Sequence, residues 1–229
     1  MGGRRWVTLP RAGIFGSARV APGGPVTATY QTATSSATDL SSYSFASQPI
    51  GTASGSRRVV VAIGWAAAGA VTLSSVTIGG VSASIDADSG NANGNRRVYF
   101  ASAVVPTGTT ATVAITLSGT VVRLGIGVWT LSGGSPTGQT AAVINADAGT
   151  LTVTTSVDDV VLAAGFLSHT SNSVTTTWTN ATERYDAQIE NVFNAHSGAD
   201  TIATTTSTGV GFSDDVTTTN RAFLAAAYA

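Results

Sequence analysis

Hydrophobic and polar residues alternate along most of this chain, with the period of two that a strand with one buried face requires. In the segment ATVAITLS, Val113, Ile115 and Leu117 alternate with threonine, alanine and serine. The same alternation recurs in three further segments, at residues 74–81, 123–131 and 150–157. Helical periodicity is almost absent, so the pattern predicts an all-β protein.

Turn-forming residues separate the predicted strands at the spacing that is typical of a sandwich. They are Gly79-Gly80, Asn93-Gly94, Pro106-Thr107-Gly108, Gly133-Gly134, Asp158-Asp159 and Asp214-Asp215. From this order we predict a two-sheet antiparallel sandwich of jelly-roll type with about ten strands. One segment departs from the pattern: residues 183–193 are dense in charge, and we expect a short helix or an irregular loop there.

The segment RLGIGVWTL, residues 123–131, places glycines at alternate positions. Leu124, Ile126 and Val128 share one face of this predicted strand, whereas Gly125 and Gly127 lie on the other. Glycine in a strand marks a close approach by another backbone or a large side chain. We therefore expect a ring or a second strand to lie across the glycine face.

The two halves of the chain resemble one another weakly. RRVVVAIGW at 57–65 aligns with DDVVLAAGF at 158–166, and the halves end alike in RLGIGVWTL and RAFLAAAYA. A spacing near 100 residues suits either two fused sandwiches, with halves at about 43–135 and 140–229, or two halves of one sandwich. We interpret residues 26–229 as one domain, because no linker separates the halves. Chance similarity between strands rich in Val and Ala explains the resemblance of the two halves equally well.

The first 25 residues differ from the rest of the chain. Their Gly and Pro residues break any regular element, and arginines alternate with bulky apolar side chains. Such a segment cannot bury its own surface, so we expect an extended docking arm that orders against a neighbouring protein. A loose tail, or a first strand folded back on the sandwich, are the alternatives. The predicted docking residues are Arg4, Arg5, Trp6, Arg11, Ile14, Phe15 and Arg19.

Composition narrows the classes of function. The 229 residues carry a net charge of −1 with only 10% charged residues, which does not favour a nucleic-acid-binding protein. Cysteine is absent, so no disulfide or thiolate chemistry is expected. No apolar run reaches the length of about 18 residues that a membrane helix needs. Thr8, Pro10, Arg11 and Gly13 interrupt the region where a signal peptide would be apolar, so we expect synthesis in the cytoplasm and release by lysis.

A cluster of aromatic and polar residues at 178–186 is a candidate glycan-binding patch. Two rings could stack on sugars while neighbouring polar groups bind hydroxyls. The patch comprises Trp178, Asn180, Glu183, Tyr185 and Asp186. Glu183, Asp186 and Glu190 could also form the carboxylate pair of a glycosidase, but a solvated loop with Trp178 in the core explains these residues better, and we predict no catalysis.

Other candidate chemistry is weaker. Asp86, Asp88, Asn91 and Asn93 offer oxygen ligands, but Arg97 stands where an EF-hand loop would need glutamate, so a hairpin turn is the better interpretation. His169 and His196 lie in polar stretches without a G-x-S-x-G motif. The sequon at Asn180 has no meaning without secretion. We therefore predict no cofactor and no metal.

Several of these segments resemble the Ala/Gly/Thr/Ser-rich β-sandwich structural proteins of tailed bacteriophages and gene transfer agents. They are SRRVVVAIGW, SSVTIGGVSAS, VPTGTTATVAITLSG, GIGVWTLSG and TTTWTNATERYDAQ, and the resemblance spans about residues 43–229. It implies a non-enzymatic virion protein, such as a head or tail decoration, fibre or spike. Its expected partners are other virion proteins (capsid, portal or tail) and further copies of itself. A module that attaches to a host surface polysaccharide is the alternative.

Overall fold

The computed structural model describes residues 25–91, 95–169, 174–190, 194–216 and 220–229, and every regular element in this part of the chain is a β-strand. The first half forms β1 (Ala28–Ser36), β2 (Leu40–Pro49), β3 (Arg57–Ala66), β4 (Leu73–Ile78), β5 (Val81–Ser82), β6 (Ser84–Asp88), β7 (Arg96–Val104), β8 (Thr110–Val121) and β9 (Arg123–Ser132). The second half forms β10 (Pro136–Ile144), β11 (Ala148–Thr154), β12 (Val160–Ser168), β13 (Thr176–Thr179), β14 (Thr182–Ile189), β15 (Asn194–Ile202), β16 (Ser207–Asp214) and β17 (Arg221–Tyr228). Within the described ranges there is accordingly no helix that could cross a membrane.

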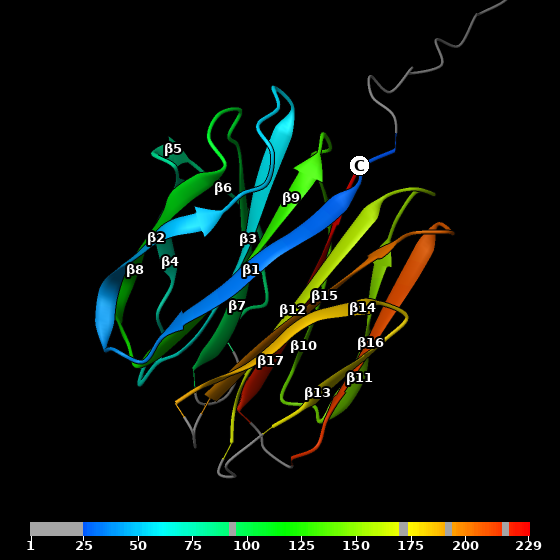
Figure 1. Cartoon of the computed structure of the whole chain (residues 1–229). Helices are drawn as coiled ribbons and strands as arrows, with labels where there is room; N and C mark the ends of the chain where they lie inside the picture. Colours follow the sequence, from blue (N-terminus) through cyan, green and yellow to red (C-terminus); the bar gives the residue numbers. More distant parts are fainter. Residues whose placement is uncertain (1–24, 92–94, 170–173, 191–193, 217–219) are drawn as a thin grey trace, which may run out of the picture.

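The strands form four antiparallel sheets, two from each half of the chain (Figure 1). In the first half, β1-β9-β3-β7-β6 form an inner sheet and β2-β8-β4-β5 an outer sheet. In the second half, β10-β17-β12-β15-β14 form an inner sheet and β11-β16-β13 an outer sheet. The predicted antiparallel sandwich is confirmed, but it has four sheets and seventeen described strands instead of two sheets and about ten strands.

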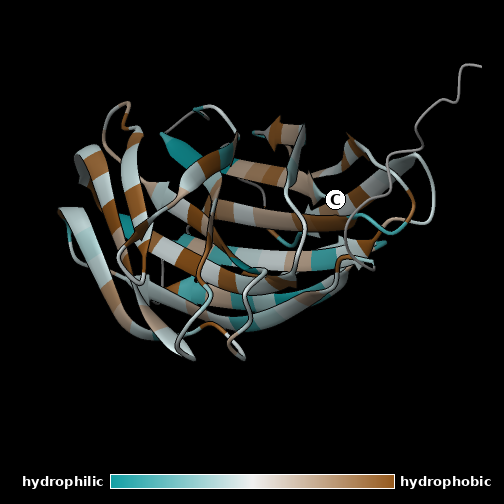
Figure 2. Cartoon of the chain, turned by 90° about the horizontal axis from the view of Figure 1, so that it is seen from above, coloured by the Kyte–Doolittle hydropathy of each residue, from teal (hydrophilic) through white to brown (hydrophobic). Residues whose placement is uncertain are grey.

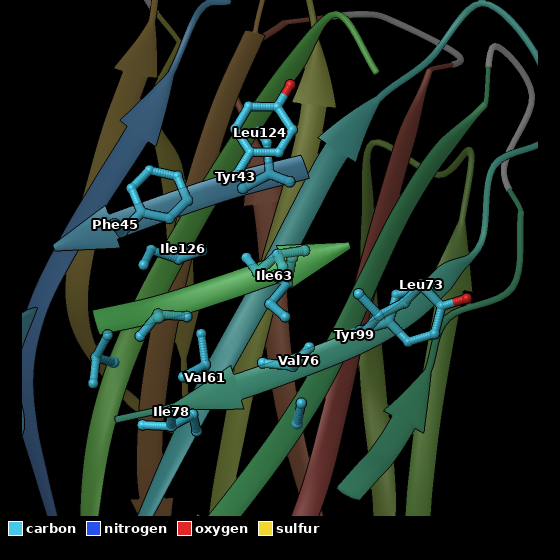
Figure 3. Close-up of a cluster of buried hydrophobic side chains, with 14 of the residues drawn as sticks. Tyr43, Phe45, Val61, Ile63, Leu73, Val76, Ile78, Tyr99, Leu124 and Ile126 are labelled. Carbon is cyan, nitrogen blue, oxygen red and sulfur yellow. The ribbon is translucent and has the colours of Figure 1, made fainter. Parts of the chain in front are cut away.

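The four sheets enclose three layers of apolar side chains. One layer lies between the sheets of the first half, one between the two inner sheets, and one between the sheets of the second half. Figure 3 shows part of the first layer, where Ile63, Val76 and Ile126 meet from different strands. The inner sheets are covered on both faces, so all nine residues of β12 are buried.

The outer sheets keep the alternation that the sequence predicts. In β8, Val113, Ile115 and Leu117 are buried, whereas Thr112, Thr116 and Ser118 on the other face are exposed. Figure 2 shows the resulting bands of apolar and polar residues along the strands. An outer strand needs only one apolar face, because its other face is hydrated through hydroxyl groups.

Both halves have the same strand order. The inner sheets read β1-β9-β3-β7-β6 and β10-β17-β12-β15-β14. The outer sheets share the order β2-β8-β4 and β11-β16-β13, and the short strand β5 extends the first of them. In each half the first strand pairs with the last and the second with the last but one. The structural repeat begins at β1, before residue 43, and each half forms two sheets of its own.

The contact between the inner sheets is also symmetric. β3 lies against β12, β9 against β15, β7 against β17, β1 against β14, and β6 against β10. Exchanging the two halves converts the β9–β15 pair into β17–β7 and the β1–β14 pair into β10–β6, and it leaves the β3–β12 pair unchanged. This is the isologous arrangement of a two-fold symmetric dimer, here within one chain.

The structure aligns the repeats one residue differently from the sequence. It equates Arg57 with Asp159, not with Asp158, because both are buried at the start of the central strand. The main-chain carbonyl of each accepts a hydrogen bond from the end of the neighbouring strand, from Val105 N at 3.1 Å and from Ala203 N at 2.8 Å. A shift of one residue moves every side chain to the opposite face of the sheet, so the sequence alignment exchanged the two core layers.

The glycine face of β9 is confirmed as a close approach. A Cβ on Gly125 would lie 2.5 Å from the His196 ring, and one on Gly127 would lie 2.5 Å from the Tyr185 ring. Both rings come from the second inner sheet. Glycines in the first half therefore make room for rings of the second half.

The prediction for residues 183–193 is wrong for the described part of that segment, because residues up to Ile189 belong to strand β14. The register between β14 and β15 shifts between Glu183 and Tyr185, as in a β-bulge. The bulge turns Tyr185 toward the inner layer while Glu183 stays exposed. Charge density concealed the strand, because an edge strand tolerates charged side chains.

Candidate functional site

A cavity of about 430 Å³, lined mainly by polar residues, lies in the first half of the chain. It is bordered by the start of β1, the end of β9 and the segment that leads into β3. Six hydroxyl side chains and one amide line it, with a single aliphatic side chain. The lining residues are Thr27, Thr29, Gln31, Gly51, Thr52, Ser54, Arg57, Thr130, Leu131 and Ser132.

Arg57 forms the buried wall of this cavity, and its side chain is 1% exposed. Its guanidinium donates four hydrogen bonds to main-chain carbonyls. The acceptors are Val105 O at 2.8 Å, Gly51 O at 2.7 Å, Gly108 O at 2.8 Å and Thr107 O at 2.6 Å. The side chain therefore fixes two loops, and one of its five N–H groups has no such acceptor.

Gly51 brings the main chain close to the cavity. Its φ of +71° is a left-handed conformation, and a Cβ there would lie 3.1 Å from Gln31 Nε2 and 3.3 Å from Thr130 Oγ1. The loop thus covers these two side chains, and only glycine combines this conformation with so close an approach.

The hydroxyl groups of the cavity differ in their hydrogen bonding. The Thr27 and Ser132 hydroxyls bind each other, and Thr130 donates to Ile50 O at 2.9 Å. The side chains of Thr29, Thr52 and Ser54 make no hydrogen bond within the described part of the chain, so each can donate and accept. None of the described residues lining the cavity is acidic. The arrangement is suited to a neutral or anionic ligand rich in hydroxyl groups.

The structure does not form the predicted glycan-stacking patch. The Trp178 ring is 7% exposed and packs on Phe212 and Phe223 in the layer between the second pair of sheets. The Tyr185 ring packs between the inner sheets, with its centroid 5.8 Å from those of Tyr30 and Trp129. β13 and β14 belong to different sheets, so the two rings lie in separate layers, where Trp178 is buried and Tyr185 is partly buried.

The polar members of that patch also have other surroundings. Asn180 and Glu183 are exposed at the turn before β14 and in its first residues. Glu190 pairs with Arg123, which also contacts Asp39 at 3.0 Å. Glu183 and Asp186 remain from the hypothetical carboxylate set, and of these Glu183 is exposed whereas Asp186 is partly buried.

Asp186 is the carboxylate with unusual surroundings. Its Oδ2 accepts a hydrogen bond from Thr176 N at 2.8 Å, while its buried Oδ1 and the buried hydroxyls of Thr176 and Ser197 have no partner among the described residues. Burial raises the pKa of Asp186 to about 6, and the charges of Glu183 and Asp215 add to this effect. The native protein therefore binds more protons than the unfolded chain between about pH 4 and 6, and Asp186 destabilises the fold above that range.

Replacing Asp186 with asparagine is expected to raise the free energy of unfolding by about 1 kcal/mol at pH 7. The amide removes the buried charge and can donate to the Thr176 or Ser197 hydroxyl. The gain should disappear toward pH 4, where the native carboxyl is protonated. Denaturant titrations at both pH values measure it, with Asp158→Asn at an exposed turn position as the control; a less stable D186N protein at pH 7 would contradict this account.

The candidate metal ligands are occupied by other contacts. Asp86 accepts hydrogen bonds from Ser84 Oγ at 2.8 Å and from Tyr228 OH at 3.1 Å. Asp88 pairs with Arg97. The Asn91 side chain donates to Asn95 at 2.9 Å, and Asn93 lies outside the described residues. These contacts fix a strand end and its turn.

Both histidines are buried. His169 shares a hydrogen bond of 3.0 Å with Gln188 Oε1. His196 lies beneath Tyr185, with ring centroids 5.1 Å apart, and burial lowers its pKa to about 4. Neither histidine lines the cavity.

Sequence reasoning missed a buried ionic cluster at the start of β17. Arg221 is fully buried and pairs with Asp214 Oδ2 at 2.8 Å and with Asp147 Oδ1 at 2.7 Å. Asp214 is also fully buried, whereas Asp147 is half exposed. Burial raises the pKa of Asp214 to about 6, although Arg221 opposes the shift. The cluster joins β17 to the end of β16 and to the turn before β11, so its role is to hold the second half together.

The interface between the inner sheets of the two halves, which we call the seam, contains further polar contacts. Trp129 Nε1 donates to Asp200 Oδ2 at 2.8 Å, and Arg184 binds the same carboxylate with two hydrogen bonds. At another edge, Arg96 Nε donates to Ser168 Oγ at 2.6 Å. These bonds fix the position of one half on the other.

The predicted docking residues between Arg4 and Arg19 lie outside the described residues.

Comparisons with protein-family models, with curated proteins and with solved structures found no match for this chain.

Proposed function

We propose that the chain is a non-enzymatic structural protein of a phage-like particle, placed there by its first 25 residues. The observation that carries this proposal is the repeated strand order. In each half, the first strand pairs with the last and the second with the last but one, across two facing sheets. We assign this order to a jelly roll, an architecture that recurs in viral capsid and lectin domains.

The surface supports the same proposal. Charged residues make up 10% of the chain, and the outer faces of the outer strands are largely threonine and serine. β6 and β10 end the two inner sheets on one side of the molecule, and β1 and β14 end them on the other. The edge strands β1 and β10 contain no charged residue, whereas β6 and β14 contain several. Uncharged sheet edges are suited to contact with neighbouring subunits, so we propose that the protein functions as one of many copies in a particle.

Deleting residues 1–25 is expected to remove the protein from purified particles while the remaining sandwich stays folded and soluble. The reason is that β1 begins at Ala28, so the deletion spares the described strands. Immunoblots of particles made with full-length and truncated chains measure incorporation, and circular dichroism of the truncated chain is the control for folding. Equal incorporation of both chains would contradict the role of the arm.

The polar cavity favours a second function, attachment to a glycan on the host surface. Its six hydroxyl side chains and one amide match the hydrogen-bonding groups of a sugar. This site replaces the patch at Trp178 and Tyr185, whose rings lie in separate apolar layers. Binding of immobilised surface polysaccharides by the purified chain tests this function.

A further inference from the structure

We propose that the cavity binds an acidic saccharide, with the sugar carboxylate facing Arg57 and the sugar hydroxyls facing Thr29, Gln31, Thr52 and Ser54. The proposal rests on the glycan-binding function and narrows it to one site and one class of ligand.

The size and chemistry of the cavity agree with such a ligand. Its volume of about 430 Å³ falls in the range of small-ligand sites, roughly 300–1,000 Å³. A saccharide presents many hydroxyl groups that both donate and accept. The free hydroxyls of Thr29, Thr52 and Ser54 can donate hydrogen bonds to these sugar hydroxyls or accept hydrogen bonds from them. Gln31 adds an amide oxygen whose described contacts leave it available.

The charge of Arg57 selects an anion. The two fully buried arginines of the described chain have different partners: Arg221 lies against two carboxylates, whereas Arg57 binds only main-chain carbonyls. Burial lowers the pKa of Arg57, and no carboxylate opposes that shift. A buried cation is normally paired with an anion. The adjoining cavity is open to a ligand, and its described lining holds no acidic side chain that would repel an anion.

The second half provides an internal comparison. Asp159 occupies the position equivalent to Arg57, and its carboxylate accepts a hydrogen bond from Ser156 N at 2.6 Å. An acidic residue at this position would repel an acidic sugar. The proposal therefore requires one binding site per chain, although the fold is repeated.

Titration calorimetry on the full-length chain tests the proposal. The probes are tetramers of galacturonic, glucuronic and mannuronic acid, each paired with its carboxyl-reduced neutral form. We expect at least one acidic tetramer to bind with one ligand per chain. It should bind at least about tenfold more tightly than its neutral form, because hydrogen bonds to charged groups are worth about 1.5–3 kcal/mol.

Two exposed hydroxyls locate the site without threatening the fold. Thr29→Val and Thr52→Val should each weaken binding of that tetramer about three- to tenfold. Thr152→Val, at an exposed position of β11 in the second half, is the matched control and should change nothing. Where Arg57→Gln gives a folded protein, it should abolish the preference for the acidic form.

Three outcomes would overturn the inference in distinguishable ways. Equal binding of acidic and neutral tetramers would reject the role of Arg57 while the glycan-binding function stands. Binding that T29V and T52V leave unchanged would place the glycan elsewhere. Binding of none of the six probes at millimolar concentration would reject the acidic saccharide, and a negative screen against immobilised neutral polysaccharides would then reject the glycan-binding function itself.

Discussion

Replacing Arg221 with methionine is expected to lower the free energy of unfolding by about 3 kcal/mol at pH 7. Methionine preserves length and apolar packing but leaves the Asp214 carboxylate, which is fully buried, without its cation. Removing one partner of a buried ion pair costs about 3–5 kcal/mol, because the remaining charge is neither solvated nor paired. The hydrogen bond from Arg221 Nη2 to Val216 O at 3.0 Å is lost as well.

The cost of Arg221→Met should depend on pH in a defined direction. The pKa of Asp214 is raised to about 6, so the native protein binds more protons there than the unfolded chain between about pH 4 and 6. At pH 5 the native carboxyl is mostly neutral, and removing Arg221 then leaves no buried anion. Denaturant titrations of both proteins at pH 7 and pH 5 should show a clearly smaller difference at pH 5.

Two further variants separate the buried charge from general damage. Arg97→Met removes the partly exposed pair with Asp88, and it should cost about 0–1 kcal/mol. The double variant Arg221→Met with Asp214→Asn should recover most of the lost stability, because it leaves no unpaired ion. A loss with R221M that is the same at both pH values, or that the second substitution does not relieve, would contradict this explanation.

The sequence carries most of the information about the strands, because a strand depends on local alternation. Val113, Ile115 and Leu117 are buried as the pattern predicts, and the glycines of β9 lie under rings. The number of sheets could not be predicted from this local alternation. β3 and β12 read as continuous apolar runs because both of their faces are covered, and such a run does not show whether the second cover is a sheet of the same half or of the other half.

The site was less predictable than the fold. The cavity brings together residues near 27–31, 51–57 and 130–132, and its side chains are mostly threonines and serines, which are common throughout this chain. Only the buried Arg57 distinguishes it, and its burial depends on long-range pairing. Conversely, Trp178 and Tyr185 are close in sequence but lie on strands of different sheets, so their proximity along the chain gave a misleading patch.

Dividing the chain between Gly133 and Gly134 is expected to give two fragments that are not monomeric alone and that recombine into a 1:1 complex. Each fragment keeps both of its sheets, but it exposes the apolar face of its inner sheet. In the first fragment this exposed face includes Phe100, Trp129 and Leu131, which the second half covers in the intact chain. An exposed apolar face of this size drives association or precipitation. Light scattering of each fragment alone and of the co-expressed pair measures the outcome.

A glycine variant ties that association to the inner sheets. A Cβ on Gly127 would lie 2.5 Å from the Tyr185 ring across the seam, whereas one on Gly55 would meet nothing within 4 Å. Gly127→Val should therefore weaken association of the fragments about tenfold to a hundredfold, because overpacking costs about 1–3 kcal/mol, and Gly55→Val should leave it unchanged. Folded monomeric fragments that do not associate would show that each sandwich is stable without the other. The seam would then be a weak contact, and the internal two-fold relation would contribute nothing to stability.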